Sequence, residues 1–219
     1  MKIVFIGDSI TDAGRNREGG AKQSALGYGF VRIVADRLIG AAPDKYTILN
    51  RGVIGNRIVD MYAGIKCRLW NEAPDLASIL IGINDVWHEI TARNGVDLCR
   101  YKQVYRMIIE GTRERLPNTK LILCEPFVVE GTDTCPTEEA PDRYARFQEI
   151  YKYAAAVREL ADEYGLYFLP LQKAFDDAVA KYGAACFAPD GVHPNVGGSS
   201  LLAGEWLRLF HEKIESDRA

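Results

Sequence analysis

The sequence has no apolar stretch long enough to cross a membrane. The apolar runs at 3–6 and 121–124 stop after four residues, whereas a membrane-spanning helix needs about 20. The start of the chain also lacks the apolar region of a signal peptide, because Gly7 and Asp8 follow the first run directly. A chain whose signal peptide had been removed would look the same. We expect a cytoplasmic protein that does not bind membranes.

The chain also has no excess of positive charge. Its 27 lysine and arginine residues are outnumbered by 30 aspartate and glutamate residues, which gives a net charge of −3 at pH 7. Binding of nucleic acid depends on positive charge that neutralises phosphates. We therefore expect no nucleic-acid partner.

Signals of paired cysteines are missing as well. The number of cysteines is odd, and none of them forms a Cys-x-x-Cys pair; they are Cys67, Cys99, Cys124, Cys135 and Cys186. Thiols scattered in this way indicate free cysteines in a reducing compartment, rather than a disulfide framework or a structural zinc site.

The remaining composition is that of an ordinary globular domain. Hydrophobic residues make up 47% and charged residues 26% of the 219 residues, and both values are average for globular proteins. The sequence shows no internal repeat, low-complexity tract or flexible linker. We therefore expect one domain that spans 1–219.

Short apolar runs alternate with longer segments of helical period. The expected strands, apolar on both faces, lie at 3–6, 46–49, 76–81, 121–124 and 167–169. The expected helices lie at 28–39, 58–72, 96–115, 142–164, 171–182 and 196–214. This alternation predicts an α/β fold, a three-layer αβα sandwich around a five-stranded, mainly parallel sheet. Such sheets bind ligands at the carboxyl ends of their strands.

Polar motifs follow the expected strands at three places, and a fourth lies near the end of the chain. Gly-Asp-Ser occupies 7–9, Gly55 lies in the segment after the second strand, Gly-Ile-Asn-Asp occupies 82–85, and Asp-Gly-Val-His occupies 190–193. Each motif alone is ordinary turn or helix-cap chemistry. Together they contain the groups that acyl transfer requires.

A serine hydroxyl becomes a good nucleophile when a base removes its proton, and histidine suits that task near neutral pH. Of the three histidines, His211 falls late in an expected helix and His88 follows the third motif, where it is a candidate for lining a pocket. His193 instead has Asp190 three residues before it. In a turn, this spacing lets the carboxylate hold one ring nitrogen while the other faces outward. His193 is therefore the candidate base and Ser9 the candidate nucleophile.

Acyl transfer also requires donors aimed at a developing oxyanion. A backbone N–H at a glycine and the side-chain amide of an asparagine both qualify. Gly55 and Asn84 follow separate strands of the expected sheet. Because the carboxyl ends of parallel strands lie at one edge, these two residues can converge on Ser9.

The four motifs, in this order, resemble the four blocks of the SGNH or GDSL hydrolases, a family named for its Ser, Gly, Asn and His. The resemblance implies a flavodoxin-like SGNH hydrolase fold and a serine esterase that needs no metal and no cofactor. It implies that Ser9 is the nucleophile, His193 the base and Asp190 its orienting acid. It also implies an oxyanion hole made of the backbone N–H groups of Ser9 and Gly55 and the amide of Asn84.

Within that family, the stretches at 5–12, 81–87 and 126–131 are most similar to intracellular acetylxylan esterases and related carbohydrate acetylesterases. This likeness implies a short acyl group, acetyl above all, on a sugar or oligosaccharide hydroxyl, and often a homo-oligomer. Asp8 is then expected to brace its loop rather than to act as the triad acid. The chain departs from close relatives at Pro189, where they often carry a large aromatic residue.

Side chains near the motifs suit a carbohydrate, because they can stack on it or form hydrogen bonds with it; they are Tyr28, Arg57, Trp87 and His88. We expect Trp87 in particular to bind substrate, although its position after a strand end also fits plain core packing. The sequence offers no long apolar segment that resembles a lipid-binding lid.

Other functions remain open at this point. The same family machinery serves lysophospholipases and thioesterases. A Mg²⁺-dependent phosphohydrolase would use Asp8, Asp12, Asp85 and Asp190, but it leaves Ser9, Asn84 and His193 without a role. A non-catalytic flavodoxin-like module is the third alternative, although receiver domains are much shorter. The Gly-x-Ser-x-Gly motif of α/β-hydrolases is absent.

Overall fold

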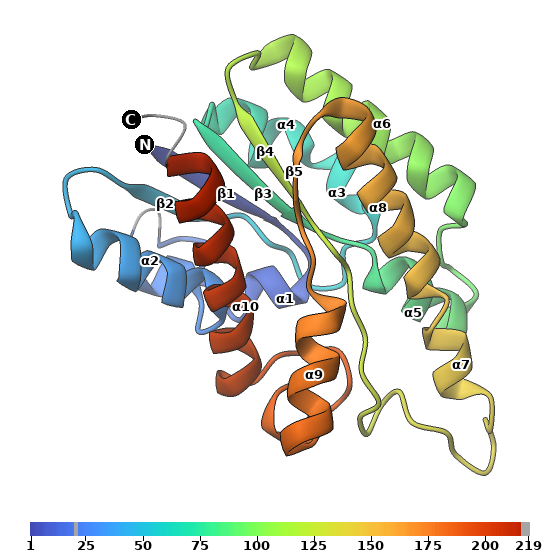
Figure 1. Ribbon diagram of the computed structural model, residues 1–219. Coiled ribbons are helices and arrows are strands. Elements are labelled where there is room, and N and C mark those ends of the chain that lie inside the picture. Colours follow the sequence, from blue (N-terminus) through green and yellow to red (C-terminus); the bar gives the residue numbers. More distant parts are fainter. Residues whose placement is uncertain (20–21, 216–219) are drawn as a thin grey trace.

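Five parallel strands form the centre of the fold in the computed structural model, which describes residues 1–19 and 22–215 (Figure 1). The strands are β1 (Lys2–Gly7), β2 (Thr47–Asn50), β3 (Leu76–Leu80), β4 (Lys120–Cys124) and β5 (Tyr167–Leu169). Their order in the sheet is β2-β1-β3-β4-β5, and every neighbouring pair is parallel. The α/β prediction and all five strands are confirmed, with boundaries shifted by at most one residue.

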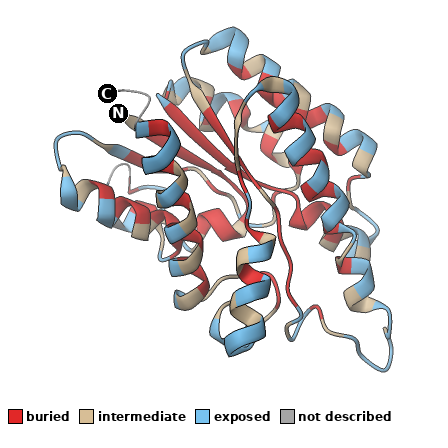
Figure 2. Cartoon of the chain, in the orientation of Figure 1, coloured by how far each residue is buried: buried red, intermediate tan, exposed pale blue. Residues whose placement is uncertain are grey.

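The strands are buried because they are apolar on both faces. In β1, the side chains of Ile3, Val4, Phe5 and Ile6 are all fully buried, and the strands form the buried centre of the molecule in Figure 2. Helices must therefore cover the sheet on both sides.

The helices flank the sheet in two groups. In one, α2 packs against α10, and in the other α6 packs against both α3 and α8. The helices are α1 (Ser9–Asp12), α2 (Phe30–Ala41), α3 (Ile58–Ala63), α4 (Ile65–Arg68), α5 (Ile83–Ala92), α6 (Leu98–Arg115), α7 (Arg143–Phe147), α8 (Ile150–Tyr164), α9 (Gln172–Tyr182) and α10 (Val196–Leu209). Within the described ranges, no helix combines the length and apolarity needed to cross a membrane.

Three expected helices are interrupted in the structure. The helix predicted at 58–72 is divided at Gly64, where the Arg68 guanidinium lies so close that a Cβ would meet it at 2.1 Å. The helix at 142–164 is divided between α7 and α8, and the helix at 196–214 widens into a π-helical turn at Phe210–Glu215. Helix α5 begins at Ile83 and contains Asn84 and Asp85, and none of the six expected helices covers it.

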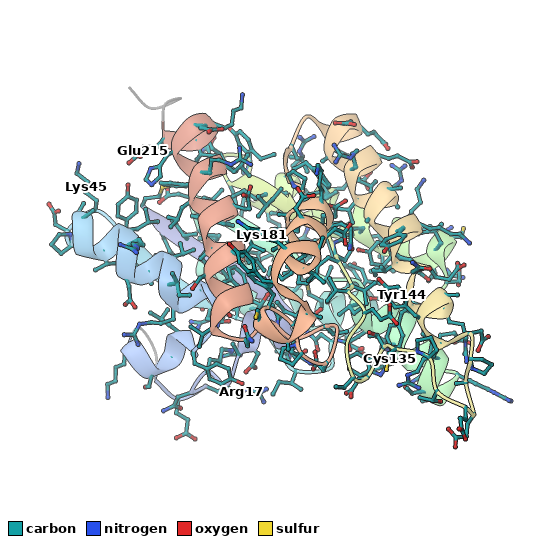
Figure 3. All side chains as sticks on the ribbon, turned by 60° about the horizontal axis from the view of Figure 1, so that its bottom comes forward. Arg17, Lys45, Cys135, Tyr144, Lys181 and Glu215 are labelled. Atoms are coloured by element: carbon teal, nitrogen blue, oxygen red, sulfur yellow. The ribbon has the colours of Figure 1, made fainter. Side chains whose placement is uncertain are left out.

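The sheet topology defines where a site can form. Strand β1 has β2 on one side and β3 on the other, so the chain connections diverge there and leave a crevice at the carboxyl ends. The register pairs Gly7 of β1 with Leu80 of β3, so the motifs after these strands begin at the same level. Figure 3 brings the lower edge of Figure 1 forward, with Arg17 and Cys135 on its two sides.

Candidate active site

Ser9 is presented by a tight turn between β1 and α1. Gly7 is required there, because a Cβ would lie 2.1 Å from the backbone oxygen of Leu80. The carboxylate of Asp8 accepts the backbone N–H of Ile10 at 3.0 Å and caps α1. Asp8 therefore braces the loop, as predicted, and its burial raises its pKa to about 7.

Ser9, His193 and Asp190 lie in one hydrogen-bonded chain. The Oγ of Ser9 is 2.8 Å from His193 Nε2, and His193 Nδ1 is 2.6 Å from Asp190 Oδ2. The other oxygen, Oδ1, accepts the backbone N–H groups of Val192 and His193. With Nδ1–H donating to Asp190, Nε2 is left to accept from the serine hydroxyl. The arrangement suits proton transfer from serine to histidine.

The charges of this chain are set by the contacts within it. The hydrogen bond that His193 donates to Asp190 raises the pKa of His193 above its usual value, against the effect of partial burial. Partial burial opposes ionisation of Asp190, but the hydrogen bonds from His193 and Val192 outweigh it and lower the pKa of this carboxyl. A carboxylate therefore faces an imidazole that readily accepts a proton.

The turn that carries His193 is fixed from its C-terminal side by α10. Asn195 caps this helix, and its Oδ1 accepts the backbone N–H groups of Gly197 and Gly198. Helix α10 is in turn anchored to the sheet, because Trp206 lies against Phe5 of β1 with ring centroids 5.1 Å apart. The histidine is thus carried by the same core that carries Ser9.

The two predicted oxyanion donors lie on segments that touch. Asn84, at the start of α5, donates from Nδ2 to the backbone oxygen of Asn56, which directly follows Gly55. Gly55 has φ +78, in the left-handed region, and open space where a side chain would be. Within the described part of the chain, the backbone N–H groups of Ser9 and Gly55 have no protein acceptor. Such free donors are what an oxyanion hole requires.

Asp85 joins the start of α5 to the start of α3. Both of its carboxylate oxygens accept the backbone N–H of Ile58, at 3.0 and 3.2 Å, and so hold the start of α3 against α5. Burial raises the pKa of Asp85 well above its usual value. From its sequence context, Asp85 was expected only to cap a helix or, in the phosphohydrolase alternative, to bind a metal ion.

Trp87 lies directly against the candidate base. Its ring centroid is 5.8 Å from that of His193 and 5.6 Å from that of Phe147 in α7. The half-buried indole therefore supports the imidazole ring. Its contact with substrate stays a prediction.

Two other residues proposed for carbohydrate binding, Arg57 and His88, lie together in contacts within the protein. Arg57 pairs with Asp60 at 2.8 Å and also donates to Asn94, and His88 is half-buried near this pair. His211 lies on an exposed turn and contacts Glu215. The structure brings neither of these histidines to Ser9.

The loop that holds the acid–base turn was not predicted. Backbone N–H groups of Val129, Thr132 and Asp133 donate to the backbone oxygens of Gly191, Pro189 and Asp190, respectively. The buried hydroxyl of Thr134 donates to the oxygen of Val129 at 2.7 Å and accepts the N–H of Gly131 at 2.8 Å.

Glycines make this close approach feasible. A Cβ on Gly131 would lie 2.1 Å from the nitrogen of Gly191, and Gly191 itself has φ +96. The only signal for this loop in the sequence was the likeness of 126–131 to family members. The exposed Pro189 contributes its backbone oxygen to this contact.

A cavity of about 230 Å³ opens beside the serine. It is formed by α1 and the turn after it, the segment before α2, the segment before Gly55, the turn into α10 and α10 itself. Its lining includes Ser9, Gly14, Tyr28, Ile54, His193 and Ser199. Trp87 is not among its lining residues.

The carboxylates of the phosphohydrolase alternative do not converge. Asp8, Asp85 and Asp190 accept from separate protein groups, and Asp12 accepts the N–H of Gly14 beside two arginines. Among the residues that the structure describes, no group of three or more His, Cys, Asp or Glu side chains could hold a metal ion.

Comparison with known proteins places this geometry in context. Residues 5–201 match the model of the GDSL-like Lipase/Acylhydrolase family. The chain is 34% identical over 213 residues to an acetylxylan esterase of Geobacillus stearothermophilus, covering 94% of this chain and 92% of that protein.

Solved structures are similar over the same extent. The acetylxylan esterase Axe2 of G. stearothermophilus has a TM-score of 0.82 and 34% identity, covering 95% of this chain and 93% of that chain. A Parabacteroides merdae structure named as a GDSL-like lipase has a TM-score of 0.87 and 34% identity. The match covers 97% of this chain and 96% of that chain. Structures of Axe2 titled as catalytic mutants carry alanine in place of a serine, an aspartate or a histidine.

Proposed function

Because the chain belongs to the GDSL-like lipase/acylhydrolase family and is a carboxylic ester hydrolase, we propose that it removes acetyl groups from sugars through an acyl-enzyme on Ser9. The observation that carries the mechanism is the chain of contacts from Ser9 through His193 to Asp190, at 2.8 and 2.6 Å. The same residue types are replaced in the catalytic mutants of Axe2, which supports these roles.

In the first half of the reaction, Ser9 Oγ attacks the ester carbonyl carbon while His193 Nε2 takes the hydroxyl proton. The carbonyl oxygen becomes an oxyanion that the N–H groups of Ser9 and Gly55 and the amide of Asn84 stabilise. The bond to the alcohol oxygen then breaks, and His193 returns the proton to that oxygen. The alcohol leaves, and the acyl group stays on Ser9.

In the second half, a water molecule attacks the acyl-enzyme. His193 takes a proton from this water, and the same donors stabilise the second oxyanion. The bond to Ser9 Oγ breaks as His193 returns the proton to the serine, and the carboxylic acid leaves. Asp190 stabilises the charged imidazole in both halves.

The acetyl-sugar specificity rests on two supports. The cavity beside Ser9 is only about 230 Å³, below the usual range of pockets that bury drug-sized ligands, so it suits a small ester such as an acetylated sugar unit. Relatives at about one-third identity are named acetylxylan esterase or acetyl-xylooligosaccharide esterase. A lysophospholipase or thioesterase is the second candidate, because the exposed side chain of Ile54 borders the cavity mouth and could meet a longer acyl chain.

An acyl-chain series separates the two candidates. We expect the kcat/KM of p-nitrophenyl esters to fall steeply from acetate to octanoate, and acetate to be released from peracetylated xylobiose. Ser9→Ala provides the blank, and activity should survive EDTA. A flat or rising series would contradict the acetylesterase and favour the long-chain candidate, since each accommodated CH₂ contributes about 0.8 kcal/mol.

A further inference from the structure

Tyr28 is the most exposed aromatic side chain among the large hydrophobic residues described, with 77% of its surface accessible, yet its position is fixed. Its backbone N–H donates to the oxygen of Ala13 at 2.9 Å. Its ring lies on Gly14, where a Cβ would come within 2.6 Å of the ring carbon Cε1. Gly14, with φ +69, thus leaves room for an aromatic ring that rests on the backbone.

The segment around Tyr28 is tightly docked on the turn that follows the nucleophile. A Cβ on Gly27 would lie 2.6 Å from the oxygens of Asp12 and Ala13, and one on Gly29 would lie 2.7 Å from the Cβ of Ala13. The turn and the segment are also tied together by Asn50, whose Nδ2 donates to the oxygens of Thr11 and Leu26. The backbone that carries the exposed ring is therefore well anchored, which lowers the ordering cost when a ligand packs on the ring.

This ring stands at the cavity that contains the reacting groups. Tyr28, Ser9 and His193 line the same 230 Å³ space, together with Ile54, which is 64% exposed. In ester hydrolysis the leaving oxygen receives its proton from His193 Nε2, so the alcohol part of the substrate must lie beside this nitrogen. A cavity bordered by His193 is therefore placed to receive the alcohol.

We propose that Tyr28 is the stacking platform for the sugar ring that leaves as the alcohol, with Ile54 as a second apolar contact; this inference rests on the proposed function. A pyranose ring presents a face of C–H groups that packs on an aromatic ring, while its hydroxyls point sideways. The same cavity offers a polar partner, because the buried Ser199 lines it and its Oγ lies 3.5 Å from the oxygen of Pro194, at the outer limit of a hydrogen bond.

The test compares two acetate esters that differ only in their alcohol. Peracetylated methyl xyloside presents a sugar ring, whereas ethyl acetate presents none, and acetate release is measured for both. For Tyr28→Ala we expect KM for the xyloside to rise about three- to tenfold, the range of an aromatic contact. We expect kcat to change little and both constants for ethyl acetate to stay unchanged.

Two further variants distinguish stacking from apolar bulk. Tyr28→Phe keeps the ring and should keep the low KM, whereas Tyr28→Leu keeps apolar bulk without a flat face and should behave like Tyr28→Ala. Tyr182→Ala is the matched control, because Tyr182 is also an exposed tyrosine, at 59%, and does not line the cavity.

Failure of the inference and failure of the proposed function give different results. If the wild-type enzyme hydrolyses the xyloside but Tyr28→Ala leaves its KM unchanged, Tyr28 is not the platform and the proposed function stands. If Tyr28→Ala instead weakens p-nitrophenyl octanoate and ethyl acetate as much as the xyloside, the ring contacts the acyl side and the inference is overturned. If the wild-type enzyme hydrolyses ethyl acetate but no acetylated sugar, both the proposed function and the inference are wrong.

Discussion

The side-chain amide of Asn84 donates to the backbone oxygen of Asn56 at 3.1 Å and so ties the start of α5 to the segment that contains Gly55. An amide group has two N–H donors. One is used in this contact, and the other remains for a substrate. The bond therefore aims the second donor while it fixes the distance between two strand-end segments.

We expect Asn84→Ala to lower kcat by about 10²–10³ with little change in KM. The donor matters most when negative charge has developed on the carbonyl oxygen, so binding of the neutral ester should hardly depend on it. Steady-state kinetics with p-nitrophenyl acetate measure both constants. Asn118→Ala, at an exposed asparagine before β4, is the control. A raised KM with unchanged kcat would make Asn84 a substrate-binding residue instead.

Ser9→Ala should fold normally and lose nearly all activity, with kcat lower by about 10⁵–10⁶. Among the residues that the structure describes, the hydroxyl forms its hydrogen bond with His193, so its loss leaves the surrounding packing in place. Mass spectrometry of the wild-type protein after treatment with a phosphonate ester should locate the adduct on Ser9. An adduct on Ser199 or Ser200, in the Gly-Gly-Ser-Ser stretch, would show that Ser9 is not the nucleophile.

The pH dependence should report the pKa of His193. This histidine must be neutral to accept the serine proton, and the hydrogen bond that it donates to Asp190 raises its pKa above the usual 6.5. The kcat/KM should therefore be full above this raised pKa and fall as pH drops through it. Asp190→Asn removes the charge that favours the imidazolium, so kcat should fall by about 10⁴ and the remaining activity should persist to lower pH.

The measurement is a kcat/KM profile between pH 5 and 9, taken for both proteins with the same buffer series. An Asp190→Asn enzyme within tenfold of the wild type, with an unshifted acid limb, would be incompatible with the proposed triad.

Much of this site could be predicted because its signals are local. The run of four apolar residues from Ile3 to Ile6 predicts β1 from the sequence alone, and all four are fully buried in the structure. A parallel sheet then places the residues that follow each strand at one edge. Asp190 and His193 are three residues apart, so their contact is a property of one turn. These features need no knowledge of distant contacts.

The missed features depend on contacts between distant segments. Thr134 lies in an exposed, acidic stretch, and nothing around it in the sequence indicates that 129–134 packs on the turn at 189–191. The close approach of the Arg68 guanidinium to Gly64, where the expected helix is divided, is likewise not indicated by the sequence. Tyr28 was predicted only as one of four side chains that suit a carbohydrate, since its support by Gly14 appears when the two loops are docked.

The buried hydroxyl of Thr134 leads to the last prediction. It bridges the oxygen of Val129 and the N–H of Gly131, and thereby shapes the loop whose backbone holds residues 189–191. Thr134→Val keeps the volume but leaves the buried oxygen of Val129 and the half-buried N–H of Gly131 without this hydrogen bond, and an unsatisfied buried group costs about 1–3 kcal/mol. We expect a lower midpoint in urea unfolding and, because the turn of Asp190 and His193 loosens, a kcat about tenfold lower.

A merely structural role would lower stability without affecting the catalytic proton transfer, so the acid limb of the pH profile is the deciding measurement. When the Asp190–His193 contact is weakened, the raised pKa of His193 moves back toward 6.5, and the acid limb of Thr134→Val should move to lower pH. Thr134→Ser restores the hydroxyl and should recover both kcat and the limb. Thr132→Val removes an exposed hydroxyl from the same loop and serves as the control. If Thr134→Val only lowers the unfolding midpoint and keeps kcat and the pH limb of the wild type, the loop stabilises the fold but does not position the triad.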